Sequence, residues 1–165
     1  MKDFAALFLA LDGTTRTNAK VAALAEYFRT AAEPERLWTI ALLSGRRPKR
    51  TVTATRLREW AAEVAGLPLW LFEESYSVVG DLAETIALVL PETSGGSDRS
   101  LTEWIVDIKG LAALEECARR DWITRAWNDL ATEERFVFNK LLTGGFRMGV
   151  SRKLMTRALS EATGL

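Results

Sequence analysis

The sequence contains no histidine and only one cysteine among its 165 residues. Without histidine, the chain lacks the side chain that most often serves as a general base near neutral pH and that most often binds transition metals. The single cysteine, Cys117, excludes an intramolecular disulfide and is typical of proteins in the reducing cytoplasm. We therefore expect a cytoplasmic protein, and the composition points to no catalytic or metal site.

Long apolar runs are absent as well. No run approaches the roughly 18 residues that a membrane-spanning helix needs, and the start, Met1-Lys2-Asp3-Phe4, lacks the small-residue cleavage site of a secretory signal. Apolar residues make up 48% of the chain, a share typical of globular proteins, and 165 residues are enough to bury a core. We expect one domain, residues 1–165, without a membrane partner.

The chain also has no net charge, since 22 lysine and arginine residues balance 22 aspartate and glutamate residues. The charges are nevertheless separated along the sequence. Segments 43–58 and 135–160 each hold six basic residues and no acid, whereas residues 59–98 hold eight acids and no base. Such blocks indicate a polarised surface with one face for an anionic partner, although ordinary solvated faces also carry charge in blocks.

Apolar side chains recur at helical spacing along almost the whole chain, and no alternating strand of useful length is present. The pattern predicts an all-α fold of about ten helices. Several helix starts carry residues that can cap them: Thr17 or Asn18, Thr51 or Thr53, Asp81, and Ser100 or Thr102. The stretch 91–98 is rich in serine and glycine and is expected to form a surface loop.

Six tryptophans and seven phenylalanines raise the question of base stacking. Trp38, Trp60, Trp104 and Trp127 fall on apolar faces at helical spacing, which favours a role in the core. Phe146 differs because it lies in a basic turn. It is the one aromatic residue that we expect to contact a sugar or a base edge.

Two segments, 36–50 and 135–149, repeat one pattern. In each, an apolar helix ends in Leu-Leu-Ser-Gly (42–45) or Leu-Leu-Thr-Gly (141–144), a basic turn follows, and a new helix begins. The second turn has three glycines, Gly144, Gly145 and Gly149, which permit positive φ angles and a close approach of the backbone to a ligand. Ser151 is placed to cap the next helix, whose first N–H groups can then meet an anion.

Both turns are therefore predicted to hold the phosphodiester backbone of a nucleic acid. The first has fewer glycines and more charge than the second, and Pro48 stiffens it. The candidate binding residues are Ser44, Gly45, Arg46, Arg47, Lys49 and Arg50 in the first copy, and Thr143, Gly144, Gly145, Phe146, Arg147, Gly149, Ser151, Arg152 and Lys153 in the second.

Glycine-rich turns also end helices in many proteins without binding anything, so a single copy would be weak support. A mononucleotide site is disfavoured because residues 144–149 lack the Gly-Lys-(Ser/Thr) ending of a P-loop and follow a helix instead of a strand.

Residues 142–153, Leu-Thr-Gly-Gly-Phe-Arg-Met-Gly-Val-Ser-Arg-Lys, resemble the signature of the N-terminal DNA-binding domain of ATP-dependent DNA ligases. Among these ligases, the sequence most resembles the bacterial enzymes. Residues 80–84 resemble the Gly-Asp-Leu element of that domain and residues 42–46 its first helix-turn, and the similarity extends from Thr17 to Leu165. The resemblance implies an all-helical domain of two pseudo-symmetric halves. Its turns would straddle the minor groove around a nick in double-stranded DNA.

The sequence also departs from the whole enzyme. Ligases form an AMP adduct on the lysine of a Lys-x-Asp-Gly motif, but the only Asp-Gly here is Asp12-Gly13, with Ala10 at the lysine position. The resemblance implies ATP and Mg²⁺ for the full-length enzyme and no cofactor for this segment. We expect an excised or separately expressed N-terminal domain that binds DNA, seals nothing, and precedes a catalytic domain in the same polypeptide.

Two other functions stay open. A helical protein–protein adaptor would use the acidic middle and the basic ends against complementary partner surfaces. A sequence-reading transcription factor is weaker, because helix 151–162 offers only Arg152 and Arg157 toward base edges. The pathway that the parent enzyme serves, whether repair, replication or end joining, is not indicated.

Overall fold

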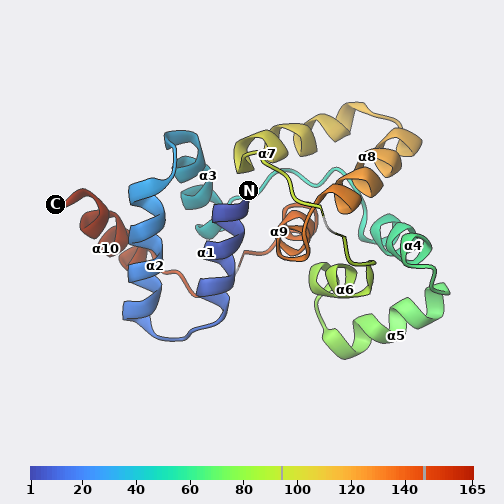
Figure 1. Ribbon diagram of the computed structural model, residues 1–165, viewed down its shortest axis with the longest axis horizontal. Coiled ribbons are helices and arrows are strands. Elements are labelled where there is room, and N and C mark those ends of the chain that lie inside the picture. Colours follow the sequence, from blue (N-terminus) through green and yellow to red (C-terminus); the bar gives the residue numbers. More distant parts are fainter. Residues whose placement is uncertain (94, 147) are drawn as a thin grey trace.

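The computed structural model describes residues 1–93, 95–146 and 148–165. These residues form helices and loops and contain no strand (Figure 1), which confirms the all-α prediction. The helices are α1 (Lys2–Asp12), α2 (Thr17–Thr30), α3 (Glu33–Leu43), α4 (Ala54–Ala65), α5 (Leu69–Val79), α6 (Leu82–Val89), α7 (Leu101–Gly110), α8 (Glu116–Asp129), α9 (Thr132–Thr143) and α10 (Arg152–Thr163), with a short 3₁₀ turn at Leu111–Ala113. None of the described helices is long and apolar enough to cross a membrane.

The helices pack in two groups. Helix α2 packs against α1 and α10, whereas α6 packs against α4, α5 and α9. Figure 1 shows α1, α2, α3 and α10 toward one end of the molecule and α4 to α6 with α8 toward the other. Contacts of α1 with α9 and of α3 with α7 join the two groups.

Each copy of the repeated sequence pattern begins in one group and ends in the other. The chain leaves α3 and reaches α4 through residues 44–53, the first basic loop. It returns from α9 to α10 through residues 144–151, the second basic loop, of which 144–146 and 148–151 are described. The two loops therefore run between the groups in opposite directions (Figure 1). Each copy therefore spans both helix groups, and neither forms a separate helix-turn-helix unit.

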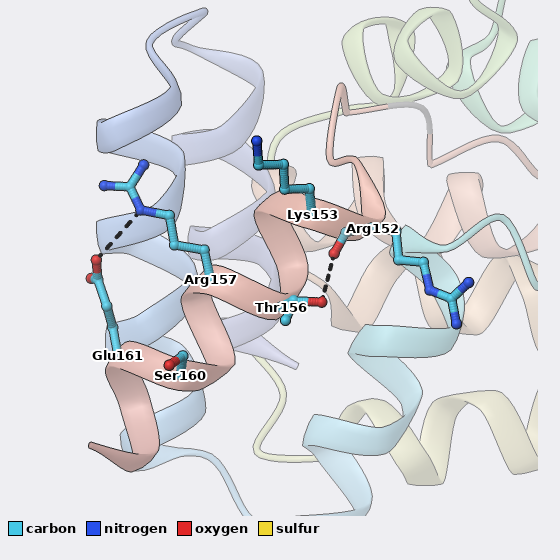
Figure 2. A pocket seen from close by; sticks show the side chains of 6 residues that line it. All are labelled: Arg152, Lys153, Thr156, Arg157, Ser160 and Glu161. Atoms are coloured by element: carbon cyan, nitrogen blue, oxygen red, sulfur yellow. Dashed lines mark hydrogen bonds and ion pairs between the residues drawn. The ribbon is translucent and has the colours of Figure 1, made fainter. Parts of the chain in front are cut away.

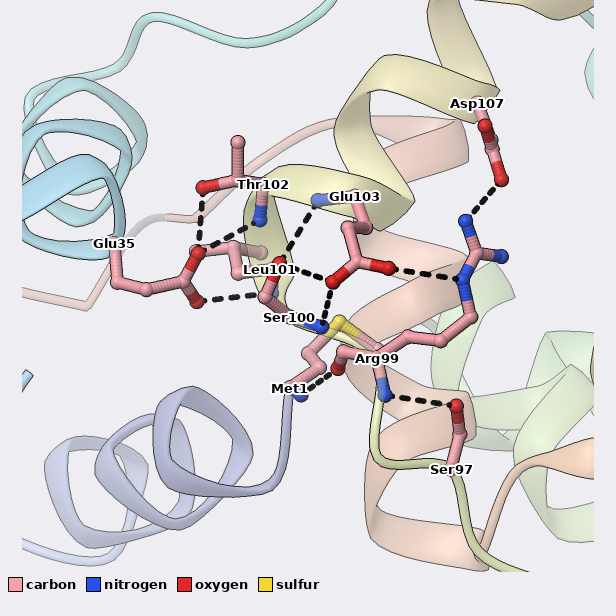
Figure 3. Close-up of polar contacts among 9 residues, drawn as sticks. All are labelled: Met1, Glu35, Ser97, Arg99, Ser100, Leu101, Thr102, Glu103 and Asp107. Carbon is pink, nitrogen blue, oxygen red and sulfur yellow. Dashed lines mark hydrogen bonds and ion pairs between the residues drawn. The ribbon is translucent and has the colours of Figure 1, made fainter. Parts of the chain in front are cut away.

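Helix α3 is fixed in place by a carboxylate that caps another helix. Glu35 accepts hydrogen bonds from the backbone N–H groups of Leu101 and Thr102, each at 2.9 Å, and from the Thr102 hydroxyl (Figure 3). These residues open α7, where N–H groups have no partner inside the helix. Ser100 and Glu103 complete a capping box at the same end. This contact determines where α3 lies and hence where the first basic loop begins.

Side-chain caps begin four helices at predicted positions. The acceptors are Thr53 for α4, Asp81 for α6, Ser100 for α7 and Ser151 for α10, each binding the N–H group three residues on. The prediction for α2 was wrong, because Arg16 occupies its N-cap position and makes no side-chain cap. The turn that precedes α2 is instead closed by Thr14, whose hydroxyl accepts a hydrogen bond from the Arg16 N–H at 3.1 Å.

The core contains most of the tryptophans that the helical spacing assigned to it. Trp60, Trp104 and Trp127 are buried. Trp38 is only half-buried and lies under the ammonium group of Lys109, 4.5 Å from the ring centre. Aromatic rings and aliphatic side chains from both helix groups join in one continuous cluster, so the two groups share a single core.

A buried polar network ties α6, α8 and α9 together. The Asn139 side chain accepts a hydrogen bond from the Trp127 indole at 2.8 Å and donates one to the Ala83 carbonyl at 3.1 Å. Arg135, counted above among the basic residues, is buried as well and donates to the carbonyls of Trp127 and Pro91, both at 2.6 Å. Because burial disfavours the charged form, it lowers the pKa of the Arg135 guanidinium. This arginine supports the fold and does not face a ligand.

Replacing Asn139 by alanine is expected to lower the free energy of unfolding by about 2–4 kcal/mol, because the Trp127 indole and the Ala83 carbonyl would both lose their buried partner. Urea unfolding followed by circular dichroism measures the change. Asn128→Ala on the exposed side of α8 is the control and is expected to cost less than about 0.5 kcal/mol. Equal costs for the two variants would contradict a structural role for the network.

Candidate nucleic-acid interface

The first basic loop presents its cations from a backbone that is anchored at two points. The loop leaves α3 through Gly45, which has a φ of +89°. Pro48 and Val52 are buried, while four cationic side chains between Ser44 and Val52 are exposed. These exposed side chains are Arg46, Arg47, Lys49 and Arg50. The alternation holds the backbone against the core and directs charge into solvent.

The second basic loop is anchored in the same way, and this corrects the role expected of Phe146. Its ring is 5% exposed and packs edge-on against Phe4 and Phe8, with ring centres 5.7 Å apart in each pair. Met148 is also buried. Phe146 is therefore an anchor in the core, not a contact to a sugar or base edge. Its apolar surface is worth more in an aromatic cluster than at a polar groove.

The two loops meet at one carbonyl oxygen. Arg47 and Arg50 of the first loop both donate hydrogen bonds to the carbonyl of Thr143, at 2.9 Å and 3.0 Å. Thr143 is the last residue of α9, where carbonyl groups lack helical partners and the helix dipole is negative. The contact joins residues nearly one hundred positions apart and brings the two predicted copies into one site.

Gly144 is needed for this contact. It has a φ of +83°, and a Cβ atom added there would lie 1.2 Å from the Nη1 of Arg47. We expected this glycine to let a ligand approach the backbone. In the structure the space is filled by an arginine from the other loop. Gly145, by contrast, has a φ of +108° but nothing within 4 Å of the added atom, so it is required by its backbone conformation alone.

Lys20 is a contributor that the sequence did not reveal. It belongs to α2, outside both repeated segments, and its ammonium group donates to the Met148 carbonyl at 2.8 Å. A Cβ atom on Gly149 would lie 2.7 Å from the same nitrogen. Lys20 therefore holds the far end of the second loop much as Arg47 holds the near end. No local pattern marks it, because only the packing of α2 against α10 brings it there.

The start of α10 provides free backbone donors. The Ser151 hydroxyl accepts the Leu154 N–H at 3.1 Å, as predicted. The N–H groups of Arg152 and Lys153, in the first turn, then have no helical acceptor. Ser151 and Arg152 line one hollow together with Ser44 and Arg46 of the first loop. Lys153 points elsewhere, away from Arg152 and out from the helix (Figure 2).

Ion pairs divide the basic residues into two classes. Arg56, Arg58, Lys140 and Arg157 each pair with a carboxylate. In the part of the chain that the structure describes, no salt bridge involves the cations predicted to bind, namely Arg46, Arg47, Lys49, Arg50, Arg152 and Lys153. Arg147, also predicted to bind, lies outside the described residues. The positive blocks of the sequence thus reduce to six described charges, four on the first basic loop and two at the start of α10.

A family model described as DNA ligase N terminus matches residues 1–160. The chain belongs to this family. The match confirms the resemblance drawn from the turn at 142–153 and extends it to α1, ahead of the Thr17 where the similarity seemed to begin. A comparison with curated proteins finds no significant match. In this ligase N-terminal domain, the signature turn is the segment that receives Arg47 across the helix groups.

Among the residues described in this ligase N-terminal domain, no three histidine, cysteine or carboxylate side chains are grouped to hold a metal ion. The hydrogen-bonding groups that the two loops and the start of α10 offer are guanidinium, ammonium, hydroxyl and backbone N–H. All of these suit the oxygens of a phosphate.

Replacing Gly144 by alanine is expected to displace Arg47 from the Thr143 carbonyl, because the new methyl group would occupy the position of the guanidinium. The side-chain ¹⁵N signals of Arg47 should shift to those of a solvated arginine. Gly145→Ala imposes similar backbone strain without the clash and is the control. Identical Arg47 signals in the two variants would contradict the role given to Gly144.

Proposed function

We propose that the chain binds duplex DNA through its phosphates, without reading sequence, and thereby positions a nick for the catalytic domain of a DNA ligase. The observation that carries the proposal is the Thr143 junction, where two cations of the first basic loop bind the end of α9, from which the second basic loop leads to Arg152 and Lys153. A duplex offers regularly spaced phosphates and little else that six cations could match. Membership of the ligase family supplies the nick as the feature to be presented.

Binding without sequence preference fits both the chemistry of the loops and the task. The charged and hydroxyl groups at the junction are donors suited to phosphate oxygens, and the aromatic ring that might have reached a base is buried. An enzyme that acts at any nick gains nothing from base contacts. Residues 1–165 would serve as the DNA-binding domain, while ATP and Mg²⁺ would belong to the catalytic domain of the same polypeptide.

The adaptor alternative is disfavoured by the acidic residues. In the described part of the chain, five of the eight acids between residues 59 and 98 form ion pairs, namely Arg56–Glu59, Arg120–Glu63, Arg58–Glu73, Lys140–Asp81 and Lys2–Asp98. An acidic docking surface would need these carboxylates for a partner. Arg47 and Arg50 at the Thr143 junction, in contrast, form no salt bridge with any described carboxylate.

The affinity for a nicked duplex is expected to fall steeply with salt and to vary little with sequence. If all six described cations displace counterions, the plot of log K against log salt concentration should have a slope of about −5. Arg46→Ala or Arg152→Ala should each reduce the slope by about one unit and weaken every sequence alike. Fluorescence anisotropy at several salt concentrations measures both quantities.

Arg120→Ala is the control for this series, because Arg120 is exposed on α8 but paired with Glu63. It should leave both affinity and slope unchanged. A flat salt dependence in the unaltered chain, or equal losses from Arg120→Ala and Arg46→Ala, would overturn the assignment of the interface.

The chain alone is expected to form no covalent AMP adduct, because it has no lysine two residues before its only Asp-Gly. Incubation with labelled ATP and Mg²⁺, followed by denaturing gel electrophoresis, tests this. A complete ATP-dependent ligase is the positive control. Label retained on the chain would show that it holds an adenylating nucleophile of another kind.

A further inference from the structure

An open hollow of about 650 Å³ separates the C-terminal half of α3 from the start of α10. Leu37, Ile40 and Ala41 of α3 and Met155 of α10 give it apolar walls. Arg46 and Arg152 line it from the two sides. In Figure 2 the side chain of Arg152 extends away from Lys153 and Arg157, out from the first turn of α10. The hollow thus lies at the edge of the proposed interface and is lined by residues of both basic loops.

One apolar side chain of this hollow is largely exposed to solvent. Leu37 is 60% exposed, although the same helix buries Leu42 and Leu43. Leu37 shares the hollow with Arg46 and Arg152, a combination that suits a partner with both apolar and anionic groups. The described residues that line the hollow include no aspartate or glutamate. A cationic partner is therefore disfavoured on charge.

We propose that the hollow seats a sugar–phosphate segment of one DNA strand, with its phosphates at Arg46 and Arg152 and the C–H edge of deoxyribose against Leu37 and Ile40. The proposal rests on the proposed function and adds a second kind of contact to it. Base edges are disfavoured as the groups that contact Leu37 and Ile40, because their hydrogen-bonding groups would be left unpaired against aliphatic side chains. The contact is consequently independent of sequence.

Apolar and ionic contacts respond differently to salt, and this difference tests the proposal. Counterion release sets the slope of log K against log salt concentration, whereas burial of apolar surface shifts the affinity by the same factor at every salt concentration. Leu37→Ala should therefore weaken binding about fivefold throughout, the effect of taking roughly 40 Å² of apolar surface out of the contact. The slope should stay at the value of the unaltered chain.

Leu88→Ala on α6 is the matched control, since Leu88 is also a helical leucine and is 63% exposed. It should leave affinity and slope unchanged. Alanine favours the helix as strongly as leucine does, so both variants should keep the thermal midpoint of the unaltered chain. Arg46→Ala, measured in the same experiment, should change the slope and thereby show that the assay separates the two kinds of contact.

The outcomes are distinct. Affinity of Leu37→Ala equal to that of Leu88→Ala would overturn the sugar contact and leave the hollow to a protein segment. A loss for Leu37→Ala that is accompanied by a change of slope would also overturn it, because the variant would then act through the cations. If the unaltered chain itself fails to bind nicked DNA, the proposed function falls, and this result is separate from either of the others.

Discussion

The interface depends on the two hydrogen bonds that Arg47 and Arg50 donate to the carbonyl of Thr143. The four cations of the first loop and the two at the start of α10 repel one another, and no carboxylate in the described part of the chain forms a salt bridge with them. The C-terminal end of α9 supplies the opposing partial charge through its unpaired carbonyls. Backbone, not acid, therefore holds the loops together. The guanidinium groups keep their full charge and their remaining N–H donors for a ligand.

The loops satisfy two opposed requirements. Their backbone must take up positive φ angles and admit side chains from elsewhere, which calls for glycine. Glycine alone would leave the loops with many conformations and a large entropic cost on binding. Buried residues between the glycines and cations limit that freedom: Pro48 and Val52 in the first loop, and Phe146 and Met148 in the second. The result is charge displayed on a backbone that is pinned to the core.

Local features of the fold could be predicted from the sequence, and long-range ones could not. The caps at Thr53 and Ser151 depend on residues three positions apart, so their pattern is visible in the chain. The burial of Phe146 and of Arg135 depends on neighbours supplied by other helices, and neither residue has a periodic context that would reveal it. The contact of Lys20 with the second loop could not be predicted for the same reason. Each copy of the repeated pattern begins in one helix group and ends in the other, and this arrangement likewise follows from packing alone.

Zero net charge is compatible with the proposed anion-binding surface, because ion pairs form between neighbouring side chains and do not depend on the charge of the whole chain. Many cations elsewhere pair with nearby acids, and the acids there outnumber the cations, so the rest of the chain balances the positive charge of the interface. Among the described residues of the interface, no salt bridge has to break before a phosphate can bind, whereas a carboxylate partner would have to be displaced at an energetic cost. Because Arg47, Arg50 and Lys20 are already held by carbonyl groups, their side-chain entropy is lost on folding and not on binding. A surface built in this way would be preorganised for the phosphates of the proposed DNA ligand, and the hollow at Leu37 would extend that preorganisation to the proposed sugar contact.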